Sequence, residues 1–177
     1  MDLARMVVHF ASTFSVAMWR LLWVLGALVG TLYVGSSLLR MQRASRLPGQ
    51  SPVTFGDILP IILIGSLLLN LSQFINATWN SFGTGTVSYG PISYSGAADF
   101  GRFAEAINAV LTIASVAGGV FFFRGVVILK KASMDGQSSH GADDYVWRAL
   151  THMVGGAMQV QIPDVIEAFR QSFGLYW

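Results

Sequence analysis

The apolar residues of this chain form four long runs, and most of the charged residues stand between them. The runs cover residues 21–39, 58–79, 106–129 and 145–162. A helix needs about 20 mainly apolar residues to cross a bilayer core of about 30 Å, and the first three runs satisfy this with at most one charge inside. The fourth run contains several polar side chains and is followed by Pro163. The pattern therefore predicts four hydrophobic helices, the fourth of which spans only inside an assembly.

Both ends of the chain show a helical stripe in place of a continuous apolar run. Residues 1–20 carry apolar side chains at helical spacing: Leu3, Val7, Phe10 and Phe14. Residues 163–177 do the same, with apolar side chains on one face: Val165, Ile166, Phe169 and Phe173. A helix with one apolar face lies in the plane of the lipid headgroups. We therefore expect amphipathic terminal helices, the second of which ends at Gly174.

The connection between the second and third runs, residues 80–105, differs in composition from the rest of the chain. It is rich in glycine, serine and tyrosine, and its acids are Asp99 and Glu105. Such a composition is typical of an exposed outward loop, in which Tyr89 and Tyr94 contact a partner or a lipid headgroup. A small hairpin-like element around Gly90 and Pro91 is the alternative.

The overall composition, together with these segments, predicts the fold class. Of the 177 residues, 53% are hydrophobic and only 11% are charged, and the mean hydropathy is +0.56. Soluble domains usually have about a quarter of their residues charged. We expect an all-α, integral membrane helical protein with a single membrane domain over 1–177. Its parts are the amphipathic segment 1–20, the first two spans 21–79, the outward loop 80–105, a helical hairpin 106–162 and the amphipathic segment 163–177.

The placement of the positive charges predicts how the helices are oriented. Arg40, Arg43 and Arg46 follow the first run, and Lys130 and Lys131 follow the third. Two spans separate these groups, so both lie on one side of the membrane, and that side is cytoplasmic by the positive-inside rule. The net charge of +2 is too small for a basic nucleic-acid surface, so no sequence-specific nucleic-acid binding is expected.

Small residues at intervals of four mark expected helix contacts. Such spacing lets two membrane helices approach closely. It occurs in the first, third and fourth runs, within one subunit or between subunits. The residues expected to pack helices together are Gly26, Gly30, Ser115, Gly118, Gly119, Gly155 and Gly156.

Candidate catalytic chemistry is sparse in the sequence. There is no cysteine, and the three histidines lie on different segments; no P-loop, nucleophile elbow or zinc-protease motif occurs. We expect no enzymatic activity, no metal site and no cofactor apart from a bound phospholipid. Ser15, Val16 and Ala17 loosely fit a leader cleavage site, but the short apolar core before them, broken by His9, favours an uncleaved end.

The third run ends in FFFRGVVILKK, in which Arg124 interrupts the apolar residues and Lys130 and Lys131 close them. Arg124 precedes Lys131 by seven residues, so both side chains lie on nearly the same helical face, about 10 Å apart along the axis. Both cations then reach one headgroup layer if the arginine side chain extends toward the membrane surface. Simple snorkelling with positive-inside anchoring is the plainer interpretation, and contact with lipid phosphate is the more specific one.

The segment 106–169 resembles the small membrane proteins of type IVB secretion and I-type conjugation systems, the TraQ and IcmC group. The matching features are the cationic helix end from Arg124 to Lys131, the stretch His152-Met-Val-Gly-Gly-Ala157, and Pro163. The layout of helix, basic loop and helix is also similar to the conjugative pilins. The chain departs from a minimal pilin in its length, in its two upstream runs and in the 13-residue polar connection from Ala132 to Asp144.

The resemblance implies a structural, membrane-embedded subunit of a conjugative type IV secretion apparatus, pilin-like and acting in DNA transfer. It implies assembly with further copies of itself and with other secretion components, and contact with membrane lipids. Arg124, Lys130 and Lys131 would then bind lipid phosphate or face a lumen. The implied location is the bacterial inner membrane, with assembly into an extracellular pilus. A fixed inner-membrane component of the secretion channel is the alternative, and a small channel or transporter is a third reading.

Overall fold

The computed structural model describes residues 3–46, 55–134 and 139–174, and these ranges consist of helices and irregular connections without a β-strand. The elements are α1 (Leu3–Arg46), α2 (Phe55–Leu69), α3 (Leu71–Asn80), the 3-10 helix η1 (Ser95–Phe103), α4 (Ala104–Met134), α5 (Ser139–Val160) and α6 (Ile162–Ser172). The expected all-α fold is confirmed. The polar connection expected between the third and fourth runs is largely helical, because α4 and α5 extend into it; residues 135–138 lie outside the described ranges.

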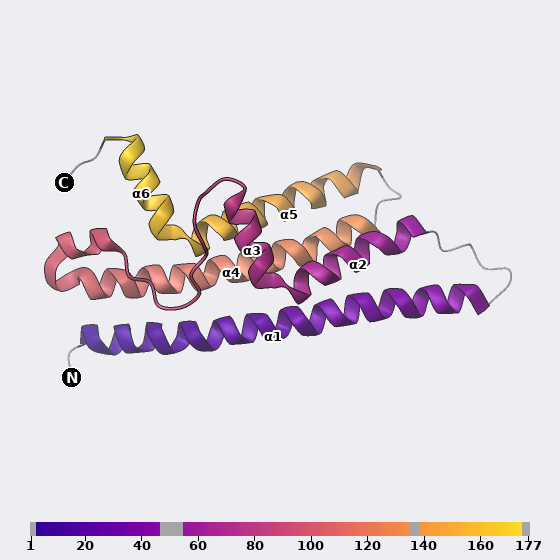
Figure 1. Cartoon of the computed structure of the whole chain (residues 1–177), viewed down its shortest axis with the longest axis horizontal. Helices are drawn as coiled ribbons and strands as arrows, with labels where there is room; N and C mark the ends of the chain where they lie inside the picture. The colour runs from indigo at the N-terminus through magenta and orange to yellow at the C-terminus, as the bar shows by residue number, and fades with distance from the viewer. Residues whose placement is uncertain (1–2, 47–54, 135–138, 175–177) are drawn as a thin grey trace.

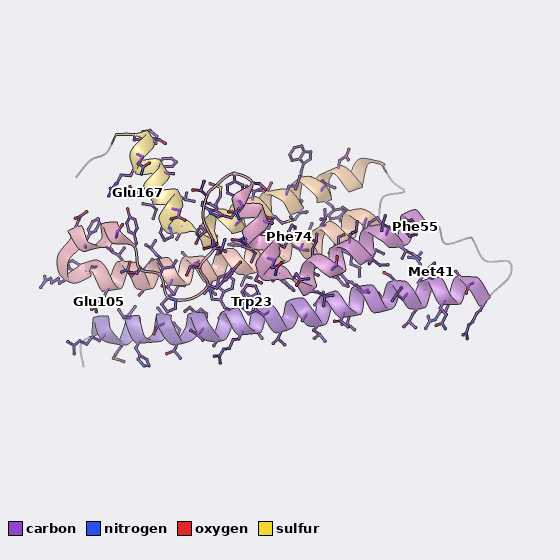
Figure 2. The ribbon with its side chains drawn as sticks, in the orientation of Figure 1. Trp23, Met41, Phe55, Phe74, Glu105 and Glu167 are labelled. Atoms are coloured by element: carbon purple, nitrogen blue, oxygen red, sulfur yellow. The ribbon has the colours of Figure 1, made fainter. Side chains whose placement is uncertain are left out.

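The helices form an elongated bundle (Figure 1). Four of them, α1, α2, α4 and α5, run along its length, whereas α3 turns across the bundle and α6 leaves it at an angle. Figure 2 places Glu105 and Glu167 toward the end at which α4 begins, and Met41 and Phe55 toward the opposite end. We call the latter the basic end, since the arginines that close α1 and the lysines that close α4 lie there.

Helix α1 merges two segments that the sequence pattern predicts as separate. Residues 1–20 do not form their own interfacial helix, because the described part of this segment continues without a break into the first apolar run. No glycine or proline interrupts residues 3–25, and Ser12 and Ser15 donate to backbone carbonyls within the helix at 2.9 and 3.0 Å. At 1.5 Å per residue, α1 is about 66 Å long, roughly twice a bilayer core.

The second apolar run is not a straight span. It is divided at Asn70 into α2 and α3, whose axes differ by 94°. Asn70 has φ −114° and ψ 45°, outside the helical region. Helix α2 is apolar apart from Asp57 and Ser66, whereas α3 buries Leu71, Ile75 and Trp79 and has polar residues between them. The change from a mainly apolar to a one-sided pattern coincides with the turn of the chain.

Fewer helices can cross a membrane than the four predicted. Within the described residues, two helical stretches are long and apolar enough, α1 and the stretch of η1 and α4, and the bent pair of α2 and α3 adds a third if it counts as one span. The prediction of a fourth span was wrong for α5. Asp143, Asp144, Arg148 and His152 interrupt its apolar sequence, and α5 packs along α4.

The connection 81–94 folds back onto the bundle and contains no β-strand. The side of the membrane that it faces stays a prediction. Side chains of α3 and α4 hold its backbone. Asn76 accepts from the Val87 amide at 2.9 Å, Thr112 from the Ile92 amide at 2.9 Å, and Asn108 from the Tyr94 amide at 3.0 Å. These bonds supply the partners that an irregular backbone needs when it lies against an apolar bundle.

Tyr89 fastens the same connection to α1. Its ring meets Trp19 and Trp23 edge to face, with centroids 4.9 Å apart in each pair. Its hydroxyl donates to the Ser72 carbonyl oxygen at 2.6 Å. Burial raises the pKa of the Tyr89 hydroxyl, since the phenolate would lose its hydration. Tyr89 is therefore a packing residue in the folded chain.

The amphipathic C-terminal helix forms where the sequence places it. Pro163 and Asp164 lie in the first turn of α6, Glu167 and Arg170 form an ion pair at 3.3 Å, and Gly174 follows the helix with φ 63°. Within α6 no residue is buried. Val165 packs against the core from this helix, whereas Phe169 and Phe173 on the same face are exposed.

Candidate functional site

Small residues bring α4 and α5 into close contact. A Cβ on Gly118 would lie 2.8 Å from the Gly156 carbonyl oxygen, and a Cβ on Gly156 would lie 2.7 Å from the Gly118 carbonyl oxygen. About two turns further along α4, a Cβ on Gly125 would lie 2.9 Å from the Ala149 carbonyl oxygen. Backbone meets backbone at each point, so α4 and α5 form a closed antiparallel hairpin.

A buried hydroxyl adds a polar tie to this hairpin. Ser115 is fully buried and donates to the Val160 carbonyl oxygen at 2.9 Å. Val160 is the last residue of α5, where helix carbonyls lack partners within the helix. Ser115 therefore closes the hairpin at the point where the chain turns into α6.

Gly119 lies on another face of α4 and receives α1. A Cβ there would lie 2.7 Å from the Trp19 ring. Trp19 also stacks on Trp23 at 5.2 Å, and its indole Nε1 is buried and has no hydrogen-bond partner among the described residues. Although Ser115 and Gly119 are four residues apart, Ser115 contacts α5 and Gly119 contacts α1.

Gly26 and Gly30 lie against α2. A Cβ on Gly26 would lie 2.9 Å from the Leu68 carbonyl oxygen, and one on Gly30 would lie 2.6 Å from the Gly65 carbonyl oxygen. Gly65 completes this contact, although the sequence analysis did not single it out. Gly155 differs from the other expected packing residues, since a Cβ there would meet nothing within 4 Å.

The three cations of α4 have different surroundings. Lys130 is half-buried, and its Nζ lies 3.7 Å from the centroid of the Tyr33 ring on α1. A cation over an aromatic face is attracted by the ring quadrupole. Arg124 and Lys131 are both exposed, and Val120 and Phe121 are exposed one turn before Arg124. Lys130 joins two helices, whereas Arg124 and Lys131 face outward.

Two further basic side chains lie near the same level of the hairpin. Ala149 and Met153 of α5 flank Gly125, which places Arg148 and His152 near the level of Arg124. The ring centroids of Phe121 and His152 are 6.2 Å apart. His152 Nδ1 lies 2.7 Å from the Arg148 carbonyl oxygen, so it is the protonated nitrogen. The sequence pattern alone did not group Arg148 and His152 with Arg124.

Arg40, Arg43 and Arg46 are exposed at the end of α1. This end points the same way as the last turns of α4 and extends beyond them (Figure 1). Lys130 contacts Tyr33, which precedes these arginines on α1. The two basic segments therefore lie at one end of the bundle. Which membrane face this end occupies stays a prediction from the positive-inside rule.

No known protein family, curated protein or solved structure matches this chain. Its function is therefore argued from its own residues and geometry. Among the described residues, no three histidine or acidic side chains gather as a metal site would require.

Proposed function

We propose that this chain is a structural, membrane-embedded subunit of a conjugative secretion apparatus of the type IVB, I-type kind, and that it assembles through the α4–α5 hairpin. The observation that supports this most is the hairpin itself, in which glycines bring two helices into backbone contact with a basic end. A helical hairpin with a cationic turn is the layout on which the resemblance to conjugative pilins rests.

The outward residues of the hairpin supply the surface for assembly. Arg124 and Lys131 stand on an otherwise apolar face of α4, and Gly155 leaves an open notch on α5. A close-packing neighbour needs such a notch, and a lipid phosphate or a polar lumen would compensate the cations. Lys130 is committed to Tyr33, so we assign the lipid-facing or lumen-facing role to Arg124 and Lys131.

A fixed inner-membrane component of the same apparatus is the second candidate. It is favoured by the way α1 holds the hairpin, with Trp19 against Gly119 and Tyr33 under Lys130. A minimal pilin hairpin carries no such partner helix. On this reading the chain remains in the bilayer as part of the secretion channel.

The proposal is tested by DNA transfer in a strain that depends on this chain. Arg124→Leu and Lys131→Glu should each lower transfer about tenfold or more, the change that a loss of about 1.4 kcal/mol of binding free energy produces. Val24→Leu, an exposed apolar change on α1, is the matched control. If both cation variants insert normally and transfer at the control frequency, the assigned role is wrong.

A further inference from the structure

Helix α6 leaves an apolar groove between itself, η1 and the start of α4. The groove has a volume of about 620 Å³. Its apolar walls come from three elements and include Phe100, Ile107, Leu111, Val165, Ile166 and Phe169. Ligand pockets usually occupy about 300–1,000 Å³, so this space is of the size that a small ligand needs.

The walls of the groove are anchored, so it is not a gap between loose ends. Gln161 donates to Asp164 at 3.0 Å and reaches the Thr86 carbonyl oxygen at 3.4 Å, which sets the direction in which α6 leaves the bundle. On the other side, the Tyr94 amide donates to Asn108, and Ala97 of η1 is buried. The groove remains open because α6 is held at its start and carries no buried residue.

The groove has one charged lining residue, Arg170, near the outer end of α6. It is partly neutralised by Glu167 at 3.3 Å, and about a quarter of its side chain is exposed. Glu167 lies on α6 at the same end of the bundle (Figure 2). The groove therefore has one charged end, at Arg170, and apolar walls next to the uncharged stretch of α4, as a headgroup layer passes into hydrocarbon.

The size and polarity of the groove indicate which ligand it binds. Water fills apolar cavities poorly. A helix is about 10 Å across, so the groove would hold only about one and a half turns of one. An alkyl chain is narrow enough to lie along the groove, and it is what a bilayer offers at this position. We propose that the groove binds one acyl chain of an anionic phospholipid, whose headgroup phosphate lies against Arg170.

This site is separate from the cations of α4, because it lies at the opposite end of the bundle. It does not rest on the proposed role in secretion, since any bilayer supplies the ligand. Its failure would leave the hairpin proposal untouched, and the reverse also holds.

The test uses the full chain in vesicles that contain phosphatidylglycerol with a photoreactive group on one acyl chain. After irradiation, mass spectrometry should place the strongest cross-links on the peptides that contain Ile107 and Ile166. Ile166→Trp should fill the groove and lower these cross-links about tenfold. Val24→Trp, an exposed site on α1, should leave them unchanged. Ile107→Trp fills the same space from α4 and replaces the first variant if that one does not fold.

Two further experiments show whether the bound acyl chain belongs to an anionic phospholipid or to a free fatty acid. Arg170→Gln should abolish the preference for phosphatidylglycerol over phosphatidylcholine while the cross-links stay in the groove. Excess unlabelled phosphatidylglycerol should compete at lower concentration than excess oleate, because the phospholipid offers Arg170 a phosphate in addition to the alkyl chain. Cross-links spread evenly over all exposed helices, unchanged labelling in both Ile166→Trp and Ile107→Trp, or oleate competing better than phosphatidylglycerol would each overturn the proposal.

Discussion

Helix α4 packs against α5 and α6 in two opposite ways. Toward α5 it presents Gly118 and Gly125, and the two backbones touch. Toward α6 it presents Ile107 and Leu111, and a groove of about 620 Å³ remains. The first interface excludes any ligand, whereas the second leaves room for one. How closely another helix packs on α4 depends on where α4 carries glycine, because the surfaces that it presents to α5 and to α6 are otherwise both apolar.

The closed interface should be the more sensitive one to added volume. Gly118→Leu places a side chain against the backbone of Gly156 and Val160, so α4 and α5 must separate, at a cost of about 3 kcal/mol. Thermal unfolding in detergent measures this loss. Gly155→Leu is the matched control, because its Cβ meets nothing within 4 Å; equal destabilisation by the two changes would contradict the assigned interface.

An effect of intermediate size is expected at Tyr89, which fixes the connection 81–94 that leads to η1 and the groove. Tyr89→Phe removes the 2.6 Å bond to the Ser72 carbonyl and should cost about 1 kcal/mol. Because burial raises the Tyr89 pKa, its contribution is fully present below about pH 10 and is lost as the pH rises further. Melting temperatures between pH 8 and pH 11 check the sign. The variant should lack this part of the alkaline loss, and Tyr94→Phe should keep it.

The smallest effect concerns the contact of α4 with α1. Lys130→Gln removes the cation from the Tyr33 ring and should cost about 0.5–1 kcal/mol. Lys131→Gln, one residue along and exposed, should leave the unfolding temperature unchanged. A double-mutant cycle with Tyr33→Leu isolates the pair. Zero coupling in that cycle would remove Lys130 from the list of packing residues.

The sequence pattern predicted the helices better than the breaks between them. The apolar runs placed the cores of α1, α2 and α4 correctly, because apolar periodicity reports burial directly. It missed the turn at Asn70 and the continuation of α1 through residues 1–20, which depend on a single backbone conformation and on the lack of a helix breaker. The error in the number of spans came from α5, where packing on α4 stabilises a helix too polar to face lipid alone.

The sequence predicted which residues make helix contacts but not which residues they contact. Four-residue spacing pointed to Gly26, Gly30 and Gly118 as contact points, since small residues at that spacing share a face. It could not show that Gly119 receives Trp19. Likewise, the charge pattern singled out Lys130 but not Tyr33, which lies on another helix almost a hundred residues earlier. Such pairings are set by the tertiary arrangement of the helices.

The most direct test of the proposed role is electron microscopy of filaments sheared from conjugating cells, with antibody labelling of this chain and matched inner-membrane fractions. A pilin-like subunit should be the main protein of the filaments and should label them along their length. The α4–α5 hairpin, with its glycine contacts, should be recognisable in their reconstruction. Finding the chain only in the inner-membrane fraction, with unlabelled filaments, would contradict the pilin-like role and leave the fixed membrane component.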